Sequence, residues 1–107
     1  MTARLDADRC HKAIVTLTEA NIADGASDLR WQLHDLMLDG VRTIVVDVSQ
    51  VDRLPSTVLA ALLATHRACR AQGGGVVIRY PGRAARALLR RTGLDHVFAV
   101  DQPTSQR

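Results

Sequence analysis

Two adjacent hydroxyl side chains, Ser56 and Thr57, stand where a polar turn runs into an apolar helix pattern. The first amide groups of a helix have no partners within it and carry the positive end of its dipole, so an anion is stabilised there. A hydroxyl at this position either caps the helix, which is the commoner role, or accepts a phosphate whose charge the free amides help to hold. Pro55 sharpens the boundary, because proline suits a first helical turn and pushes Leu54 towards an extended conformation.

The hydrophobic pattern predicts the elements on both sides of this turn. Thr43 to Val48 is a short β-branched run interrupted only by Asp47, which indicates a buried strand. From Ser56 onwards the apolar residues wind one stripe around a helix, which ends at the glycines of Gln72 to Gly75. The stripe consists of Val58, Leu59, Leu62, Leu63 and Cys69, with Arg67 and Arg70 outside it.

Another strand and helix precede this unit. Ala13 to Thr18 has strand composition, and the turn residues of Asn21 to Ser27 offer Asp24 or Ser27 as a helix cap. The helix that follows ends at Gly40. Its apolar residues share one face, and they are Leu29, Leu33, Leu36 and Met37.

Trp31 falls outside that apolar face. We expect its ring to lie flat over the edge of the core, which is the commoner arrangement for an amphipathic aromatic side chain. The alternative is an exposed ring that marks a contact surface.

The remainder of the chain continues the alternation. Val76 to Ile78 is a buried strand, Arg83 to Arg91 a short helix and Val97 to Val100 a final strand before a polar tail of residues 101–107. The short helix offers Ala84, Leu88 and Leu89 to the core and carries Arg83, Arg86 and Arg90 on another face. Such a stripe is usually a solvated face, and the alternative is a docking surface for an acidic partner.

Alternating strands and helices predict a single α/β domain in which helices cover a mostly parallel sheet through right-handed crossovers. A length of 107 residues allows one core, at about residues 13–100, and 47% hydrophobic residues support a globular chain. The net charge of +3 is mild and does not by itself indicate nucleic-acid binding.

The order of these motifs resembles the STAS domain, the fold of bacterial anti-sigma factor antagonists. The resemblance rests on VVDVSQVDRLPSTVLAALLATHRACRAQGGGVVI and on LLRRTGLDHVF, and it covers roughly Ala13 to Val100. It implies a mixed or mostly parallel sheet of four to five strands with three to four helices. The sheet of the family is mixed at its N-terminal edge, and the resemblance leaves open whether the lead-in Arg4 to Arg9 supplies that edge strand. Asp47 matches the strand aspartate of the family and Thr57 its phosphorylated hydroxyl, with Ser56 as the second candidate.

The resemblance implies a regulatory binding module rather than an enzyme. In that family the unphosphorylated domain binds an anti-sigma factor that is also a serine kinase, and phosphorylation ends the binding. The expected partner contacts are Asp47, Asp52, Arg53, Leu54, Pro55, Ser56, Thr57 and Val58. Pro55 and Val58 replace the aspartate and glycine that flank the hydroxyls in the family. The alternatives are therefore a partner-binding module without phosphorylation, or a ligand or nucleotide sensor that uses the helix start as an anion site.

Other chemistry finds little support in the sequence. The three glycines precede a strand, whereas a phosphate loop lies between a strand and a helix, and no nucleophile and base spacing occurs. We expect no cofactor, no metal, no membrane span and a cytoplasmic location, because the N-terminus carries no apolar signal segment. A zinc site made of Cys10, His11, His66 and Cys69 is a remote alternative, since neighbouring Cys and His are not a usual finger spacing.

Overall fold

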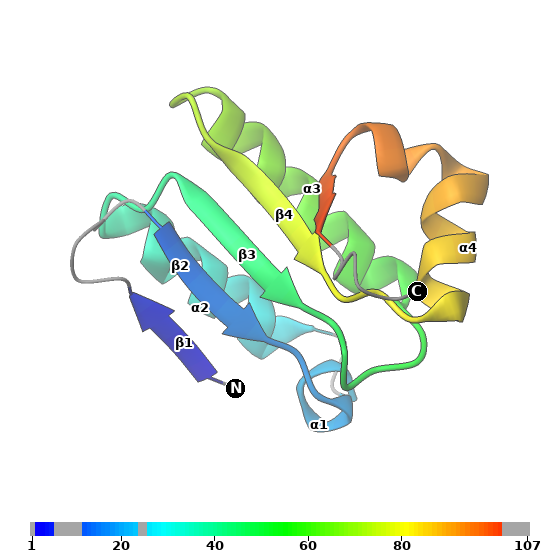
Figure 1. The fold of residues 1–107 in the computed structure, drawn as a ribbon. Helices are drawn as coiled ribbons and strands as arrows, with labels where there is room; N and C mark the ends of the chain where they lie inside the picture. Colours follow the sequence, from blue (N-terminus) through cyan, green and yellow to red (C-terminus); the bar gives the residue numbers. More distant parts are fainter. Residues whose placement is uncertain (1, 6–11, 24–25, 102–107) are drawn as a thin grey trace.

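Five strands form one sheet in chain order, β1 to β5, in a computed structural model that describes residues 2–5, 12–23 and 26–101 (Figure 1). The strands are β1 (Thr2–Leu5), β2 (Lys12–Thr16), β3 (Thr43–Asp47), β4 (Gly75–Arg79) and β5 (Ala99–Asp101). β1 is antiparallel to β2, whereas β2 to β5 are parallel. The predicted mixed sheet is confirmed. Its edge strand β1 begins at Thr2, before the lead-in Arg4 to Arg9, and includes only Arg4 and Leu5 of it, while residues 6–9 lie outside the described residues.

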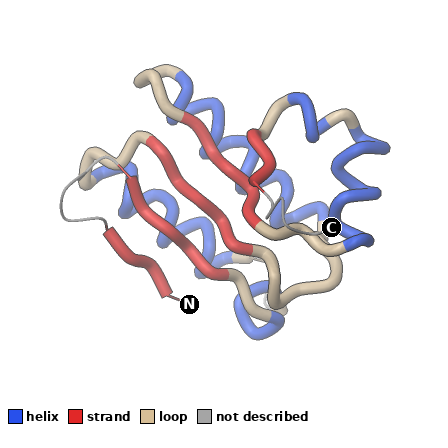
Figure 2. The backbone as a smooth tube through the Cα atoms, in the orientation of Figure 1, coloured by secondary structure: helices blue, strands red, loops and turns tan. Residues whose placement is uncertain are grey.

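Helices connect the parallel strands: α1 (Glu19–Ile22), α2 (Ser27–Leu38), α3 (Ser56–Arg70), α4 (Arg83–Thr92) and the 3-10 turn η1 (Leu94–His96). α2 and α3 pack against each other behind the sheet, and α4 lies beside them (Figure 1). Because the crossovers alternate strand and helix, α2, α3 and α4 all begin at the edge where the parallel strands end (Figure 2). Within the described residues no helix is both long and apolar enough to traverse a bilayer.

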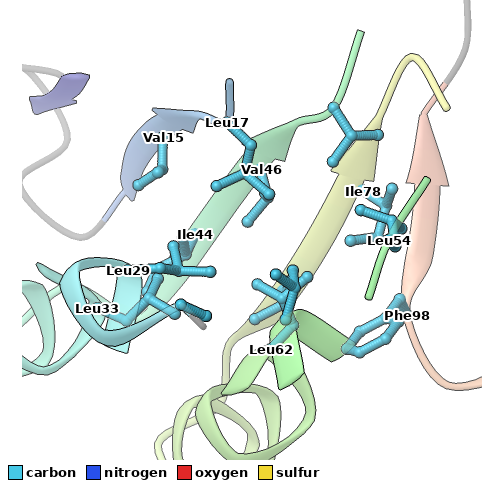
Figure 3. Packing of buried hydrophobic residues seen from close by; sticks show 14 of the residues in the cluster. Val15, Leu17, Leu29, Leu33, Ile44, Val46, Leu54, Leu62, Ile78 and Phe98 are labelled. Carbon is cyan, nitrogen blue, oxygen red and sulfur yellow. The ribbon is translucent and has the colours of Figure 1, made fainter. Parts of the chain in front are cut away.

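The core lies between the sheet and these helices (Figure 3). Alternate residues of β2 to β4 point into it, and it holds few aromatic rings, so its volume comes from aliphatic side chains and Phe98. The predicted stripes of α2 and α3 face this core. Its largest members include Leu17, Leu29, Leu33, Ile44, Leu62, Ile78, Leu89 and Phe98.

The structure corrects several local predictions. The strand predicted at Ala13 to Thr18 ends at Thr16, because the N–H and the hydroxyl of Thr18 both donate to Asn21 Oδ1 at 2.9 Å and begin α1. Asn21 and Ile22, of which Asn21 was predicted as the first residue of a turn, therefore belong to a short helix. Ser27 does not cap α2 but is its first residue; the cap is Ala26, with a φ of 71° and a buried side chain. The alternative cap, Asp24, lies outside the described residues.

Two corrections concern the C-terminal third. On α4 the alanine that enters the core is Ala85, whereas Ala84 is exposed, because Ala85 lies four residues before the buried Leu89 and shares its face of the helix. The final strand begins at Ala99, later than the predicted Val97, because the N–H groups of Val97 and Phe98 both bond to the Leu94 carbonyl and not to a neighbouring strand. Asp101 belongs to this strand, and the rest of the predicted tail, residues 102–107, lies outside the description.

His66 on α3 joins the helix to the sheet. Its Nδ1 accepts a hydrogen bond of 3.0 Å from the Val76 N–H, and its ring meets Phe98 edge-on with centroids 5.3 Å apart. Burial, and secondarily the charge of Arg70, lower the pKa of His66 from its ordinary value of 6.5. A protonated imidazole could not accept the Val76 hydrogen bond, so the folded state holds the neutral ring.

This predicts a stability loss in mild acid. The unfolded chain protonates His66 near pH 6.5, above the lowered folded pKa, so the stability that His66 contributes is full above pH 6.5. It is lost as the pH falls through the folded pKa. Thermal melts of the wild type should show this decline, and His66→Asn, which keeps an acceptor that does not titrate, should flatten it. His96→Asn, at an exposed side chain, is the control; a flattening equal to that of His66→Asn would assign the decline to another group.

Candidate functional site

α3 begins with two exposed hydroxyl side chains. Pro55 caps the helix with extended backbone angles, φ −59° and ψ 155°, and Ser56 and Thr57 are its first two residues. Among the described residues no hydrogen bond engages either hydroxyl, so the interpretation of these residues as helix caps is wrong. The Leu59 N–H bonds to the Pro55 carbonyl at 3.0 Å, and the amides before it have no partner in the helix. The two hydroxyls and the positive end of the helix dipole therefore face solvent together.

The loop before α3 is held from beneath by apolar side chains. Val48, Val51 and Leu54 are buried at intervals of three residues, and Val58 on α3 is fully buried. Asp52 and Arg53 lie between these anchors and are exposed. Of the predicted contact residues, Leu54 and Val58 consequently belong to the core and fix the loop, whereas Asp52, Arg53, Ser56 and Thr57 form its outer surface.

Asp47 ends β3 and is tied into its own turn. Its Oδ1 accepts a hydrogen bond of 2.9 Å from the Ser49 N–H, an arrangement that steers the chain away from the sheet. Neighbouring strands fix this point on both sides: the Leu17 N–H bonds to the Asp47 carbonyl and the Val48 N–H to the Arg79 carbonyl, each at 3.0 Å. Asp47 therefore shapes the base of the loop, while Asp52 is presented to solvent.

A groove lies between α2 and α3, and on α3 it is lined from Ala61 onwards, beyond the first turn of the helix. Trp31 projects beside it with 69% of its surface exposed, so the expectation that its ring lies over the core is wrong and the ring is exposed, as in the alternative. The groove has a volume of about 590 Å³. Its lining consists of Ser27, Arg30, Trp31, His34, Met37, Ala61, Ala64, Thr65 and Ala68.

Small residues on α3 create this groove. Ala61, Ala64 and Ala68 recur at intervals of three and four residues, so they form one narrow stripe opposite Trp31. A stripe of alanines on an otherwise leucine-rich helix is a signal that the sequence contained and that the prediction of contacts overlooked. Among the described residues of the lining, the titratable groups are Arg30 and His34. The rings of His34 and Trp31 meet edge-on, with their centroids 6.2 Å apart. The groove thus combines an aromatic wall, an apolar floor and a basic rim.

The two described residues of the remote zinc alternative, His66 and Cys69, have other roles in the structure. Cys10 and His11 lie outside the described residues. His66 Nδ1 is engaged by the backbone of Val76, and burial raises the pKa of the Cys69 thiol, whose sulfur lies 3.3 Å from Met37 Sδ. Across residues 2–5, 12–23 and 26–101, no three His, Cys, Asp or Glu side chains gather in a way that could hold a metal ion.

Comparison with known proteins identifies the same architecture. A family model described as "Mlab, STAS domain" matches residues 5–100. No curated protein matches the sequence significantly.

Solved structures match over nearly the whole chain. An anti-sigma factor antagonist from Mycobacterium paratuberculosis is 28% identical with a TM-score of 0.67, over 97% of this chain and 86% of that one. The unphosphorylated anti-sigma factor antagonist SpoIIAA is 15% identical with a TM-score of 0.79, over 98% of this chain and 90% of that one. A candidate anti-sigma factor antagonist from Thermotoga maritima is 18% identical with a TM-score of 0.77, over 98% of this chain and 88% of that one. The last two, at such low identity, establish the fold.

Proposed function

The chain belongs to the STAS domain family, and from that premise we propose that it is an anti-sigma factor antagonist: a protein that binds an anti-sigma factor and so releases a sigma factor. The observation that carries the proposal is the start of α3, where Ser56 and Thr57 are exposed and their hydroxyls do not cap the helix. The exposed residues Asp52 and Arg53 lie in the loop just before them. The 28% identity to an antagonist over 97% of the chain supports the same role.

The proposed interface has two parts. One is the loop and first turn of α3, with Asp52, Arg53 and Thr57 as contacts. The other is the groove beside Trp31, into which an apolar helix face of the partner would pack, with a carboxylate near Arg30. Both parts lie on α3 and its neighbour, so one partner surface can cover them together.

Thr57 is the proposed switch. A phosphate on its hydroxyl would place about two negative charges in the interface. Their desolvation costs free energy of binding, and they repel acidic groups of the partner. The free amides at the helix start would stabilise that phosphate, so the modified protein stays folded while its binding surface changes. The partner is then proposed to be an anti-sigma factor of the serine-kinase type.

Thr57→Glu should therefore weaken the affinity for the anti-sigma factor by about three- to tenfold, the range expected for one unfavourable charge at an interface. It should not weaken the fold, because a carboxylate in the first turn interacts favourably with the helix dipole, by about 0.3–1 kcal/mol. The partner is recovered with the tagged protein from its native cell, identified by mass spectrometry, and titrated against purified variants by calorimetry.

Gln72→Glu is the matched control, because it adds the same charge at an exposed site just beyond the opposite end of α3. It should leave the affinity unchanged. Equal affinities of Thr57→Glu and the wild type would move the interface away from the start of α3. Recovery of partners that include no sigma-factor regulator would contradict the proposed function itself.

A second candidate is an antagonist or scaffold that binds its partner without phosphorylation. The burial of Val58 favours it, since a kinase gains close access to the backbone when this position is glycine. Phosphate mapping on Ser56 and Thr57 across growth and stress separates the two. Phosphate on Thr57 supports the switch, and a bound partner with neither hydroxyl modified supports constitutive binding.

A further inference from the structure

α4 carries four exposed arginines on the face opposite the core. Arg83, Arg86, Arg90 and Arg91 lie on the outer side, whereas Ala85 and Leu89 are buried beneath them. The helix contains no acidic residue. One short element thus concentrates four of the 14 lysines and arginines of the chain on one surface.

This arrangement works against the stability of the helix. Arg83 and Arg86 are three residues apart and Arg86 and Arg90 four, so like charges are neighbours along the helix surface. Arg83 also occupies the first turn, where the helix dipole disfavours a cation. Only Arg90 and Arg91, in the last turn, are placed favourably. The repulsion among these arginines destabilises the helix, so their placement is not explained by a role in folding.

None of the four arginines forms an ion pair within the described part of the molecule. The ion pairs there are Arg79 with Asp101 at 3.2 Å and, for a protonated ring, His96 with Asp95 at 3.8 Å. Asp95 lines a hollow of about 260 Å³ together with Arg86, Leu89, Arg90 and Val100, yet its Oδ1 makes no hydrogen bond. The hollow is large enough for a partner side chain that donates a hydrogen bond to Asp95, while the two guanidinium groups at its rim remain for carboxylates outside the hollow.

The position of α4 links this face to the proposed interface. β3 and β4 are adjacent parallel strands, and the Val48 N–H bonds to the Arg79 carbonyl, so α3 and α4 start at the same edge of the sheet (Figure 2). We infer that the arginine face of α4 docks onto a cluster of carboxylates on a protein partner, with exposed Val100 as an apolar contact beside it. The inference rests on the proposed function in that the anti-sigma factor is the protein expected to carry the acidic cluster.

A protein surface fits better than a nucleic acid. Asp95 lines the hollow beside Arg86 and Arg90 and would repel a phosphate backbone that passes along these arginines, whereas a protein can place its carboxylates on the outer side of the arginines. Exposed Val100 adds apolar area that a nucleic-acid backbone does not use.

The test measures binding of a fluorescently labelled oligoglutamate peptide, and separately of a labelled DNA duplex, by anisotropy at low ionic strength. We compare the wild type with the triple variant Arg83→Gln, Arg86→Gln, Arg90→Gln. The matched control removes the same charge elsewhere, by Arg42→Gln, Arg67→Gln and Arg70→Gln, all at exposed sites. The α4 variant should bind the peptide roughly fivefold more weakly and melt at or above the wild-type temperature, while the control binds as the wild type does.

Each other outcome overturns the inference. Equal weakening by the control variant would mean that net charge alone attracts the peptide, and absence of peptide binding would mean that no carboxylate site exists on α4. Tighter binding of the duplex than of the peptide would assign the face to nucleic acid. Thr57→Glu is included because α4 docking of the peptide should not depend on it. A failure of the peptide test therefore remains distinct from a failure at the start of α3.

Discussion

Trp31→Ala is expected to reduce the affinity for the anti-sigma factor by roughly thirtyfold or more, which corresponds to about 2 kcal/mol, the size of an interface hot spot. The ring is 69% exposed in the free protein and stands beside an apolar groove, so most of its surface remains available for burial by a partner. The same exposure means that its removal should change the free energy of unfolding by less than about 1 kcal/mol. Loss of binding would thus occur in a folded protein.

Trp31 is the only tryptophan of the chain, so its fluorescence reports directly on this surface. Addition of a partner that lacks tryptophan at its own interface should shift the emission to shorter wavelength as the ring leaves water. Leu38→Ala is the matched control, because Leu38 is 72% exposed on the same helix but does not line the groove. A loss of affinity as large for Leu38→Ala, or an unshifted emission on binding, would place the partner on another face.

Gly74→Ala is expected to destabilise the fold by about 3 kcal/mol or more and to lower the thermal midpoint by on the order of 10 °C. A Cβ on Gly74 would collide with the Arg42 carbonyl group, whose oxygen accepts the Gly75 N–H at 3.0 Å. The carbonyl group is backbone and the position of a Cβ is fixed by the backbone, so neither partner of the clash can turn aside. Relief requires that the start of β4 move away from β3, on the strand pair at the centre of the sheet.

Thermal and denaturant unfolding measure this effect, with Gly82→Ala as the control. A Cβ on Gly82 meets no atom within 4 Å, so the cost there should stay below about 1 kcal/mol, arising only from the loss of a favoured helix-cap residue. Similar midpoints for the two variants would show that the loop before β4 can relax, and the close approach of Arg42 would then not constrain the sheet.

Short-range patterns carried much of the architecture. The β-branched run before Asp47, the proline before Ser56 and the glycines after Arg70 act within a few residues of where they stand, so β3, α3 and its end could be predicted closely. The arginine face of α4 was equally visible, because helical periodicity alone separates it from the core. The error at the cap of α2 arose where a backbone angle, the positive φ of Ala26, follows from tertiary packing, whereas the start of α1 depends on the local hydrogen bonds between Thr18 and Asn21.

The sequence by itself determined the fold class and the place of the hydroxyls, because both depend on local spacing and on the apolar periods of single elements. Only the tertiary structure decided which of the predicted contacts are surface. Leu54 and Val58 turn inward because the sheet lies beneath them, whereas Asp52 and Arg53 turn outward. It also decided the exposure of Trp31, since the groove exists only where α2 packs beside the alanine stripe of α3. Contacts between elements distant in sequence depend on the sum of many weak packing interactions, and no local pattern encodes that sum.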